Sequence, residues 1–154
     1  MVTTLVRGHY ESPIGLLEVR GSEMGILSIK YTEDEHPEAG TFDCLQECID
    51  QLHAYFGKKD HIFHSLPLLL NATDFQREVW DEVCTIPPGQ QKTYGQIAKM
   101  IGNPHAMRAV GTALKTNPLL IVIPCHRVVP QKDGIGNYAG GNWRKEWLLS
   151  HEET

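Results

Sequence analysis

The apolar residues of this chain change their spacing once, and that change limits the folds open to it. Between residues 2 and 31, β-branched and aromatic residues alternate with polar ones in three runs, TTLVRGHY, LLEVRG and GILSIKY, separated by turn residues. This period of two predicts the strands of an antiparallel meander. Further along, apolar residues recur every three or four positions, which predicts helices. We therefore expect an α+β protein with a small sheet first and a mainly helical part after it.

Residues 1–70 are expected to form one α/β domain. After the strands, a three- and four-residue apolar spacing predicts one amphipathic helix packed on the sheet, through Phe42, Leu45, Ile49, Leu52 and Phe56. Gly57 is expected to end this helix. Pro67 and the polar segment 71–74 then predict a connection, which puts the domain boundary near residue 71.

Residues 71–154 are expected to form a second domain that contains a helix-turn-helix. Its first helix, FQREVWDEVCTI, is predicted to begin after Thr73 or Asp74 as cap and to end at the Pro-Pro-Gly sequence of residues 87–89. The segments TYGQIAKMIG and HAMRAVGTALKTN then predict two short helices, and the Asn-Pro pair at 103–104 predicts the turn between them.

Small side chains are frequent in the second of these helices, at Ala106, Ala109, Gly111 and Ala113. They allow something to approach the helix closely, either a neighbouring helix or a binding partner. Because Gly111 costs a helix roughly 1 kcal/mol relative to Ala, its presence favours a contact reason over chance.

The charge of the chain is unevenly distributed. The formal net charge is -5, yet residues 75–127 carry 6 basic and 3 acidic side chains, whereas residues 1–74 carry 5 and 12. Since phosphate binding depends largely on Lys and Arg, this pattern is compatible with a salt-sensitive DNA-binding face on residues 75–127. Ordinary variation of the surface is the alternative interpretation.

Location and redox state bound the chemistry of the four cysteines. The sequence has no apolar run that could span a bilayer and no secretory signal, so we expect a cytoplasmic protein, or a nuclear one in a eukaryote. Its cysteines should then be reduced. The spacing of Cys44 and Cys48 is too loose for a zinc motif, so both, like Cys84, are expected to pack in the core, and we expect no metal site.

Cys125 is the candidate nucleophile. The apolar run LLIVI predicts a buried strand that ends just before Cys125 and would give it a rigid mount. A thiolate needs a nearby base or positive charge, and His126 and Arg127 are adjacent. A carboxylate that orients the histidine could come from Glu146, Glu152 or Glu153. The alternative is a cysteine that is simply a small apolar residue of the core.

The segments RAVGTALKTNP, PCHRVV, GNYAGG and KEWLLSHE, together with FQREVW and IPPGQQKTYGQIA, resemble the O6-alkylguanine-DNA alkyltransferase family. The resemblance runs from Phe75 to Glu152, and residues 1–70 fit in general outline. It implies an RNase H-like first domain and a single-turnover transfer of an alkyl group from O6-alkylguanine in DNA to a cysteine. It also implies no metal and no organic cofactor.

The resemblance assigns roles to five residues. Cys125 corresponds to the alkyl acceptor, His126 to a base that acts through a bound water, and Glu152 to the carboxylate that orients this base. Asn117 corresponds to the asparagine that braces the turn after the second helix, and Tyr94 to the tyrosine that assists departure of guanine.

The resemblance also implies that the second helix lies in the minor groove of double-stranded DNA without sequence preference, while Arg108 fills the space of the flipped-out nucleotide. The DNA-binding residues would be Thr93, Ala106, Met107, Arg108, Ala109, Gly111 and Lys115. The pocket for the alkylated guanine would be formed by Val128, Ile135, Gly136, Asn137, Tyr138 and Ala139. Ala139 stands where relatives carry Ser, which bears on the hold on O6 and the range of lesions.

The resemblance further implies a monomer, and O4-alkylthymine is a second candidate substrate. One rival function is that of a non-enzymatic relative that binds alkylated DNA, but such proteins lack the cysteine. The other is a helix-turn-helix regulator, which would carry several base-reading side chains on its second helix. The segment HAMRAVGTALK has one Arg and mostly small residues, which disfavours that rival.

Overall fold

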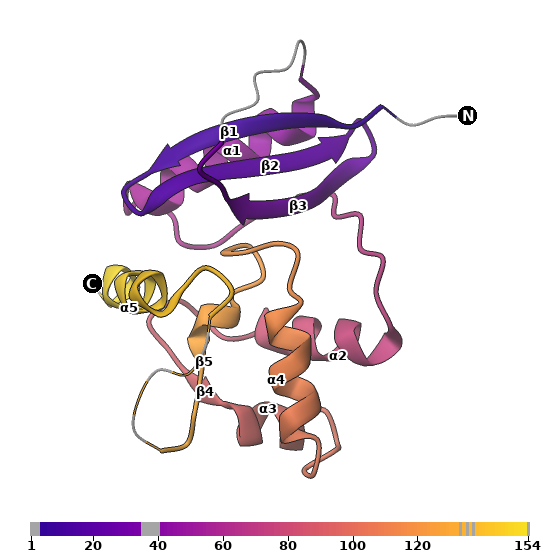
Figure 1. Ribbon diagram of the computed structural model, residues 1–154, viewed down its shortest axis with the longest axis vertical. Helices are drawn as coiled ribbons and strands as arrows, with labels where there is room; N and C mark the ends of the chain where they lie inside the picture. The colour runs from indigo at the N-terminus through magenta and orange to yellow at the C-terminus, as the bar shows by residue number, and fades with distance from the viewer. Residues whose placement is uncertain (1–3, 35–40, 133, 135, 137, 154) are drawn as a thin grey trace. The chain divides into compact units, whose positions relative to one another are not determined.

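The computed structural model describes residues 4–34, 41–132, 134, 136 and 138–153, and its fold is α+β, as predicted (Figure 1). The chain divides into two compact units, Met1–Leu70 and Asn71–Thr154.

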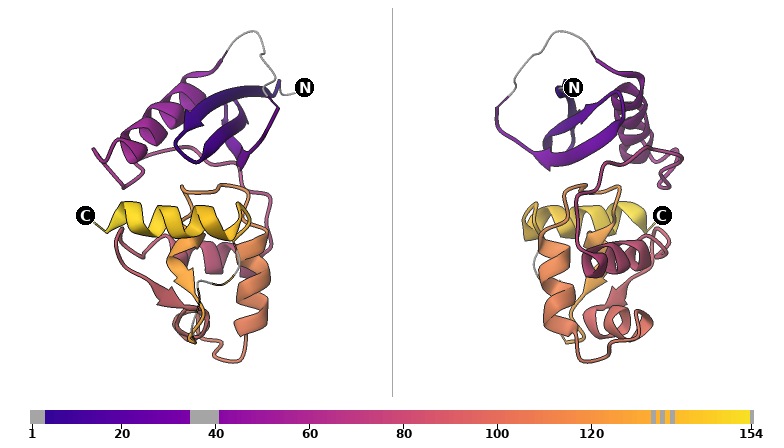
Figure 2. Two further views of the ribbon diagram at one scale, coloured as in Figure 1. Left: turned by 60° about the vertical axis from the view of Figure 1, so that its left-hand side comes forward. Right: turned by 90° about the vertical axis from the view of Figure 1, so that its right-hand side faces the viewer.

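The first unit is a three-stranded antiparallel sheet with one helix on one face (Figures 1 and 2). Its strands are β1 (Val6–Ser12), β2 (Gly15–Ser22) and β3 (Gly25–Tyr31), and its helix is α1 (Asp43–Phe56). A Cβ at Gly8 on β1 would lie only 2.8 Å from Ile49 Cδ1 on α1. The missing side chain therefore permits close packing of the helix on the sheet.

Helix α1 buries the face that its apolar spacing predicted. Leu45, Cys48 and Leu52 have no exposed surface, and the last turn buries Tyr55 and Phe56. No side chain caps the N-terminus of the helix, so its stability depends on this packed face.

The second unit contains the remaining helices. They are α2 (Asp74–Val83), α3 (Tyr94–Met100), α4 (Met107–Lys115), a 3₁₀ turn η1 (Cys125–Arg127) and α5 (Asn142–Glu152). Of the two candidate caps of α2, Thr73 is the cap. Its hydroxyl accepts from the Gln76 amide, and the Gln76 side chain accepts from the Thr73 amide.

Helices α3 and α4 form the predicted helix-turn-helix and pack against α2 (Figure 2). The second helix begins two residues later than the sequence suggested, because the Ala106 amide donates to the Asn103 carbonyl in the preceding turn. Its end is anchored from α2, where the buried Trp80 indole donates to the Ala113 carbonyl at 2.9 Å.

The strand predicted for LLIVI is wrong. Residues 119–123 form a compact loop in which the Val122 amide donates to the Leu120 carbonyl at 2.9 Å. Ile121 has a φ of 75°, a left-handed conformation that a β-branched residue rarely adopts. The run is apolar because the loop is buried, and its amides bond within the loop instead of to a neighbouring strand.

A short parallel pair of strands connects the start of the helix-turn-helix to the segment after this loop. Strand β4 (Lys92–Thr93) pairs with β5 (Val128–Val129), which follows η1 directly. The pair therefore links the first turn of α3 to the turn that carries Cys125. Within the described part of the chain, no helix has the length and apolar character needed to cross a membrane.

Candidate active site

Cys125 lies on the 3₁₀ turn η1 and not at a strand end, which corrects the sequence interpretation. Its amide donates to the Ile123 carbonyl at 2.7 Å, and only 4% of its surface is exposed. Pro124, with φ -80° and ψ 59°, makes the sharp bend that allows this bond. The thiol is thus held by a tight turn.

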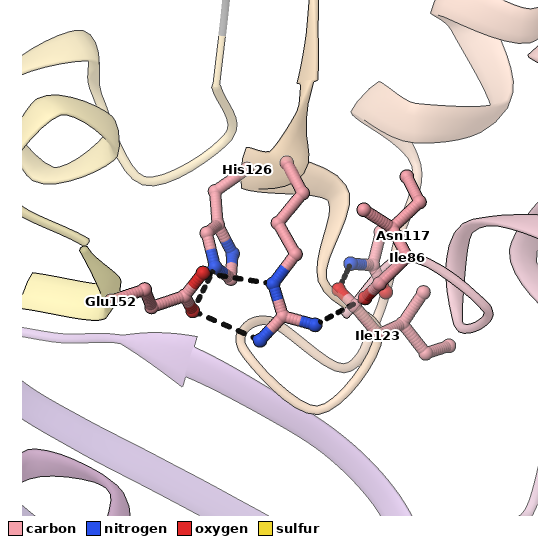
Figure 3. Close-up of polar contacts among 6 residues, drawn as sticks. Ile86, Asn117, Ile123, His126 and Glu152 are labelled. Atoms are coloured by element: carbon pink, nitrogen blue, oxygen red, sulfur yellow. Dashed lines mark hydrogen bonds and ion pairs between the residues drawn. The ribbon is translucent and has the colours of Figure 1, made fainter. Parts of the chain in front are cut away.

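Asn117 connects this turn to the end of α4. Its side-chain amide donates to Cys125 Sγ at 3.0 Å and to the Ile123 carbonyl at 2.9 Å, and the second bond is drawn in Figure 3. Its side-chain oxygen accepts from the Leu119 amide at 2.9 Å. One buried side chain therefore sets both the path of the loop and the surroundings of the sulfur.

His126 and Glu152 form a buried pair. His126 Nε2 lies 2.7 Å from Glu152 Oε2 (Figure 3), so the structure brings Glu152, of the three candidate carboxylates, to the histidine. An ionised carboxylate can only accept, so the proton of this bond belongs to Nε2 and the lone pair of a neutral ring belongs to Nδ1. Nδ1 is buried and has no hydrogen-bond partner among the described residues. The ring is therefore oriented with an unprotonated nitrogen.

Arg127 holds the same carboxylate. Its Nε donates to Glu152 Oε1 at 2.8 Å, its Nη2 donates to Oε2 at 3.0 Å, and its Nη1 donates to the Ile86 carbonyl at 2.8 Å. Burial opposes ionisation of Glu152, but the bonds from His126 and Arg127 outweigh it and lower the pKa of the carboxyl. The sequence suggested Arg127 as a charge for the thiol, and in the structure it binds the orienting carboxylate.

Lys145 is a functional candidate that the sequence reasoning missed. Its side chain is 1% exposed, and Nζ donates to the Val128 carbonyl at 2.6 Å. Burial lowers the pKa of Lys145 to about 8. Lys145 precedes Glu152 on α5 by about two helical turns, and this shared face was the signal available in the sequence.

These surroundings define the resting protonation states. Burial raises the pKa of Cys125 to about 11, although the Asn117 hydrogen bond and the Lys145 charge lower it in part. Burial lowers the pKa of His126, as do the charges of Arg127 and Lys145, while Glu152 opposes them. At neutral pH the two neighbours are thus a thiol and a neutral imidazole, an acid and a base. Among the described residues no hydrogen bond joins their side chains directly.

A hollow of about 440 Å³ lies along one side of α4 and is called the α4 hollow below. It is lined by Tyr94, Met107, Arg108, Gly111, Thr112, Leu114, Lys115, Pro130 and Gly136. Its volume falls within the roughly 300–1,000 Å³ that small-molecule pockets occupy. Gly136 has a φ of 76°, and a Cβ there would lie 2.8 Å from the Tyr94 hydroxyl, so their close approach depends on glycine.

Family models match both units of the chain. Residues 5–70 match the ribonuclease-like domain of 6-O-methylguanine DNA methyltransferase, and residues 74–154 match the DNA-binding domain of the same protein. The chain belongs to the 6-O-methylguanine DNA methyltransferase family. The predicted ribonuclease-like character of the first domain is thereby confirmed, and DNA is a partner of the second.

Individual relatives agree with this family. The methylated-DNA–protein-cysteine methyltransferase of Shigella flexneri is 50% identical over 103 residues, which are 67% of this chain and 60% of that protein. The Methanosarcina mazei protein of the same name is 40% identical, with 94% of each chain covered. The crystal structure of Mycobacterium tuberculosis O6-methylguanine methyltransferase has a TM-score of 0.86 at 37% identity, covering 97% of this chain and 93% of its own. A further M. tuberculosis structure, in complex with DNA, has a TM-score of 0.83 at 39% identity, covering 94% and 91%.

The structure brings together only some of the residues that the family resemblance assigns to DNA contact. Those that line the α4 hollow are Met107, Arg108, Gly111 and Lys115. Ala109 is exposed and Ala106 half-buried, both outside the lining of the hollow. Thr93 is the cap of α3, and its hydroxyl accepts from the Gln96 amide at 3.0 Å. Contact with DNA stays a prediction for all of them.

The residues assigned to the guanine pocket are described in part. Val128 and Tyr138 are buried, and the Tyr138 ring lies edge-on to the His126 ring with 6.2 Å between centroids. Ala139 is exposed. Ile135 and Asn137 lie outside the described residues.

The other cysteines only partly follow the sequence prediction. Cys48 is buried in the core, and Cys44 is half-buried with its thiol donating to the Ser22 carbonyl at 3.1 Å. Core packing of Cys84 was a wrong prediction, because this residue forms the C-cap of α2 and is exposed there. Within the described ranges, no cluster of three His, Cys, Asp or Glu side chains is arranged to hold a metal ion.

Proposed function

We propose that this chain repairs DNA by moving the alkyl group of O6-alkylguanine to Cys125, once per molecule, as a methylated-DNA–protein-cysteine methyltransferase. One observation carries this proposal: Asn117 joins the buried Cys125 sulfur to the end of α4, the helix that the family resemblance assigns to DNA. A base bound beside α4 would thereby meet a fixed nucleophile. The cationic side chains of Arg127 and Lys145 are buried in the same site.

The transfer step balances without a cofactor. The sulfur electron pair forms a bond to the alkyl carbon, the carbon–O6 bond breaks, and its electrons remain on guanine. The thiol proton passes through a bound water to His126 Nδ1, whose other nitrogen is held by Glu152 at 2.7 Å. Tyr94, in the α4 hollow, donates its hydroxyl proton to the guanine anion, and the tyrosinate regains a proton through solvent as His126 releases the thiol proton. The products are a thioether on Cys125 and an unmodified guanine in the DNA chain.

The roles of His126 and Lys145 follow from the requirements of the step. A thiol with a pKa of about 11 attacks only if a base accepts its proton as the bond forms. Burial lowers the pKa of His126, so the ring is neutral at neutral pH and can accept that proton. Lys145 supplies positive charge that lowers the pKa of the thiol. The sulfur of a thioether is a poor leaving group, so the alkyl group is not returned and the transfer is irreversible.

DNA recognition in this proposal uses the exposed face of α4. This face offers Arg108 and Lys115 as cations and small side chains at Ala109 and Gly111, which suits the minor groove, about 6 Å wide. Arg108 takes the place of the extruded nucleotide, which must leave the stack because O6 is inaccessible inside it. We further propose that the protein binds double-stranded DNA as a monomer in the cytoplasm or nucleus, and that O4-alkylthymine is a second substrate.

The proposal is tested with DNA that contains O6-methylguanine labelled in the methyl group. We expect the label on the peptide that holds Cys125, at no more than one equivalent per chain. Cys125→Ala is expected to retain binding to the lesion while accepting no label. Release of the label as methanol, or binding by the wild type without transfer, would show a different activity.

A further inference from the structure

Met107 is an apolar side chain with 44% of its surface exposed, at the N-terminal end of α4. The buried residues of α4 are Val110, Ala113 and Leu114, and Met107 is not among them. Its side chain leans over the first turn of α3, where a Cβ at Gly95 would lie 3.7 Å from Met107 Sδ. Because Met107 also lines the α4 hollow, its exposed thioether is available to a group bound there.

The α4 hollow has two distinct ends along the helix. Met107, Gly111 and Leu114 follow one another at the four- and three-residue spacing that puts them on one side of α4, and all three line the hollow. Leu114 lies at the end next to Asn117, whose amide bonds the Cys125 sulfur. Met107 lies at the opposite end, about 10 Å away at 1.5 Å of rise per residue.

The base of an extruded nucleotide must occupy the inner end, because its O6 substituent has to reach Cys125. The distance of about 10 Å along α4 from Leu114 to Met107 is longer than a purine base measured from O6 to its glycosidic nitrogen. The group beside the outer end is therefore the sugar. Deoxyribose presents methylene and methine carbons, which match a flexible thioether better than they match a polar side chain. The exposed cations of the same hollow, Arg108 and Lys115, suit the flanking phosphates.

We propose that Met107 packs against the deoxyribose of the extruded nucleotide and thereby favours alkylguanine within a DNA chain over the free base. This inference rests on the proposed function and adds a specificity-determining residue to it. The contact is made after extrusion, in the hollow. It therefore contributes equally to single-stranded and duplex substrates.

The test compares rate constants of methyl transfer to Cys125 from three substrates that carry O6-methylguanine: the free base, a single-stranded oligonucleotide and a duplex. Met107→Ala is expected to lower the ratio of oligonucleotide to free-base rates about four-fold in both strand states, the effect of losing about one buried methylene contact. Met107→Leu should restore the ratio to within about two-fold, because Leu keeps the apolar volume.

Met100→Ala serves as the matched control, since Met100 is 46% exposed on α3 but does not line the hollow. An unchanged ratio in Met107→Ala would overturn the sugar contact. A loss confined to the duplex would also overturn it, because that result assigns Met107 to the base stack. Absence of methyl on wild-type Cys125 with every substrate would instead defeat the proposed function, so the two failures are distinguishable.

Discussion

The Glu152 carboxylate accepts two hydrogen bonds from the Arg127 guanidinium, at 2.8 and 3.0 Å, in a site where both side chains are buried. One of the two carboxylate oxygens also bonds His126. The charge state of the proposed base therefore depends on a residue that does not touch the thiol.

Arg127→Met is expected to destabilise the protein by about 3–5 kcal/mol, because it leaves Glu152 buried without its cation. It should also raise the pKa of the Glu152 carboxyl and loosen the orientation of His126, which slows methyl transfer. Urea denaturation and single-turnover kinetics measure the two effects. The double variant Arg127→Met with Glu152→Gln should cost less than the two single changes added together. Additive costs would show that the two residues act independently.

Lys145→Met tests the role of the buried ammonium group in activity. Lys145 is cationic below its pKa of about 8 and favours the Cys125 thiolate only in that state. The transfer rate of the wild type should therefore level off and decline above pH 8. The variant should transfer more slowly at pH 7 and lack this feature of its pH–rate profile. A decline of the same size and midpoint in both proteins would assign it to another group.

The same variant tests the linkage between Lys145 and stability. The folded-state pKa of about 8 lies below the unfolded value of about 10.4, so the unfolded chain binds more protons between these limits. The free energy of unfolding of the wild type should therefore rise with pH in this window, compared with that of Lys145→Met. The slope of the difference is at most about 1.4 kcal/mol per pH unit. Below pH 8 the difference should be constant. Denaturation from pH 7 to 10.5 measures it, and parallel curves across the window would contradict burial of the charge.

Asn117→Ala and Asn117→Asp separate the two functions of this side chain. Asp keeps an acceptor for the Leu119 amide, but it loses the donated bonds and puts negative charge beside the sulfur. We expect Ala to cost about 1–3 kcal/mol of stability because buried groups lose partners. Asp should raise the pKa of the Cys125 thiol more than Ala does, which the pH dependence of iodoacetamide labelling measures. An equal thiol pKa in both variants would mean that Asn117 acts on the loop alone.

Arg108→Ala is expected to slow repair of a lesion in duplex DNA more than in single strands, since only a duplex leaves a space in the stack to fill. Lys115→Ala is the matched control on the same helix face, because a phosphate contact contributes to both substrates. The Lys115 variant should also reduce the salt dependence of binding by about one counterion. Equal losses on both substrates for Arg108→Ala would argue against the space-filling role.

Local patterns in the sequence were sufficient for the three-stranded sheet and for helices α1 to α4. The period of two predicted β1 to β3, the apolar spacing from Phe42 to Phe56 predicted α1, and Asn103-Pro104 predicted the turn between α3 and α4. These features are encoded by neighbours a few residues apart, so composition and spacing reveal them. The family resemblance then supplied the roles of Cys125 and His126.

Only the tertiary structure decided how the site is assembled. LLIVI is typical of a strand because its residues are apolar and β-branched, and the sequence shows this. The local hydrogen bonds that fold it into a loop are seen only in the structure. The cation of Arg127 is adjacent to Cys125 in sequence but is directed to Glu152, 25 residues further along. Lys145 became a candidate only when α5 placed it against the Val128 carbonyl. Such contacts depend on long-range packing and on desolvation of charge, and no local pattern records either.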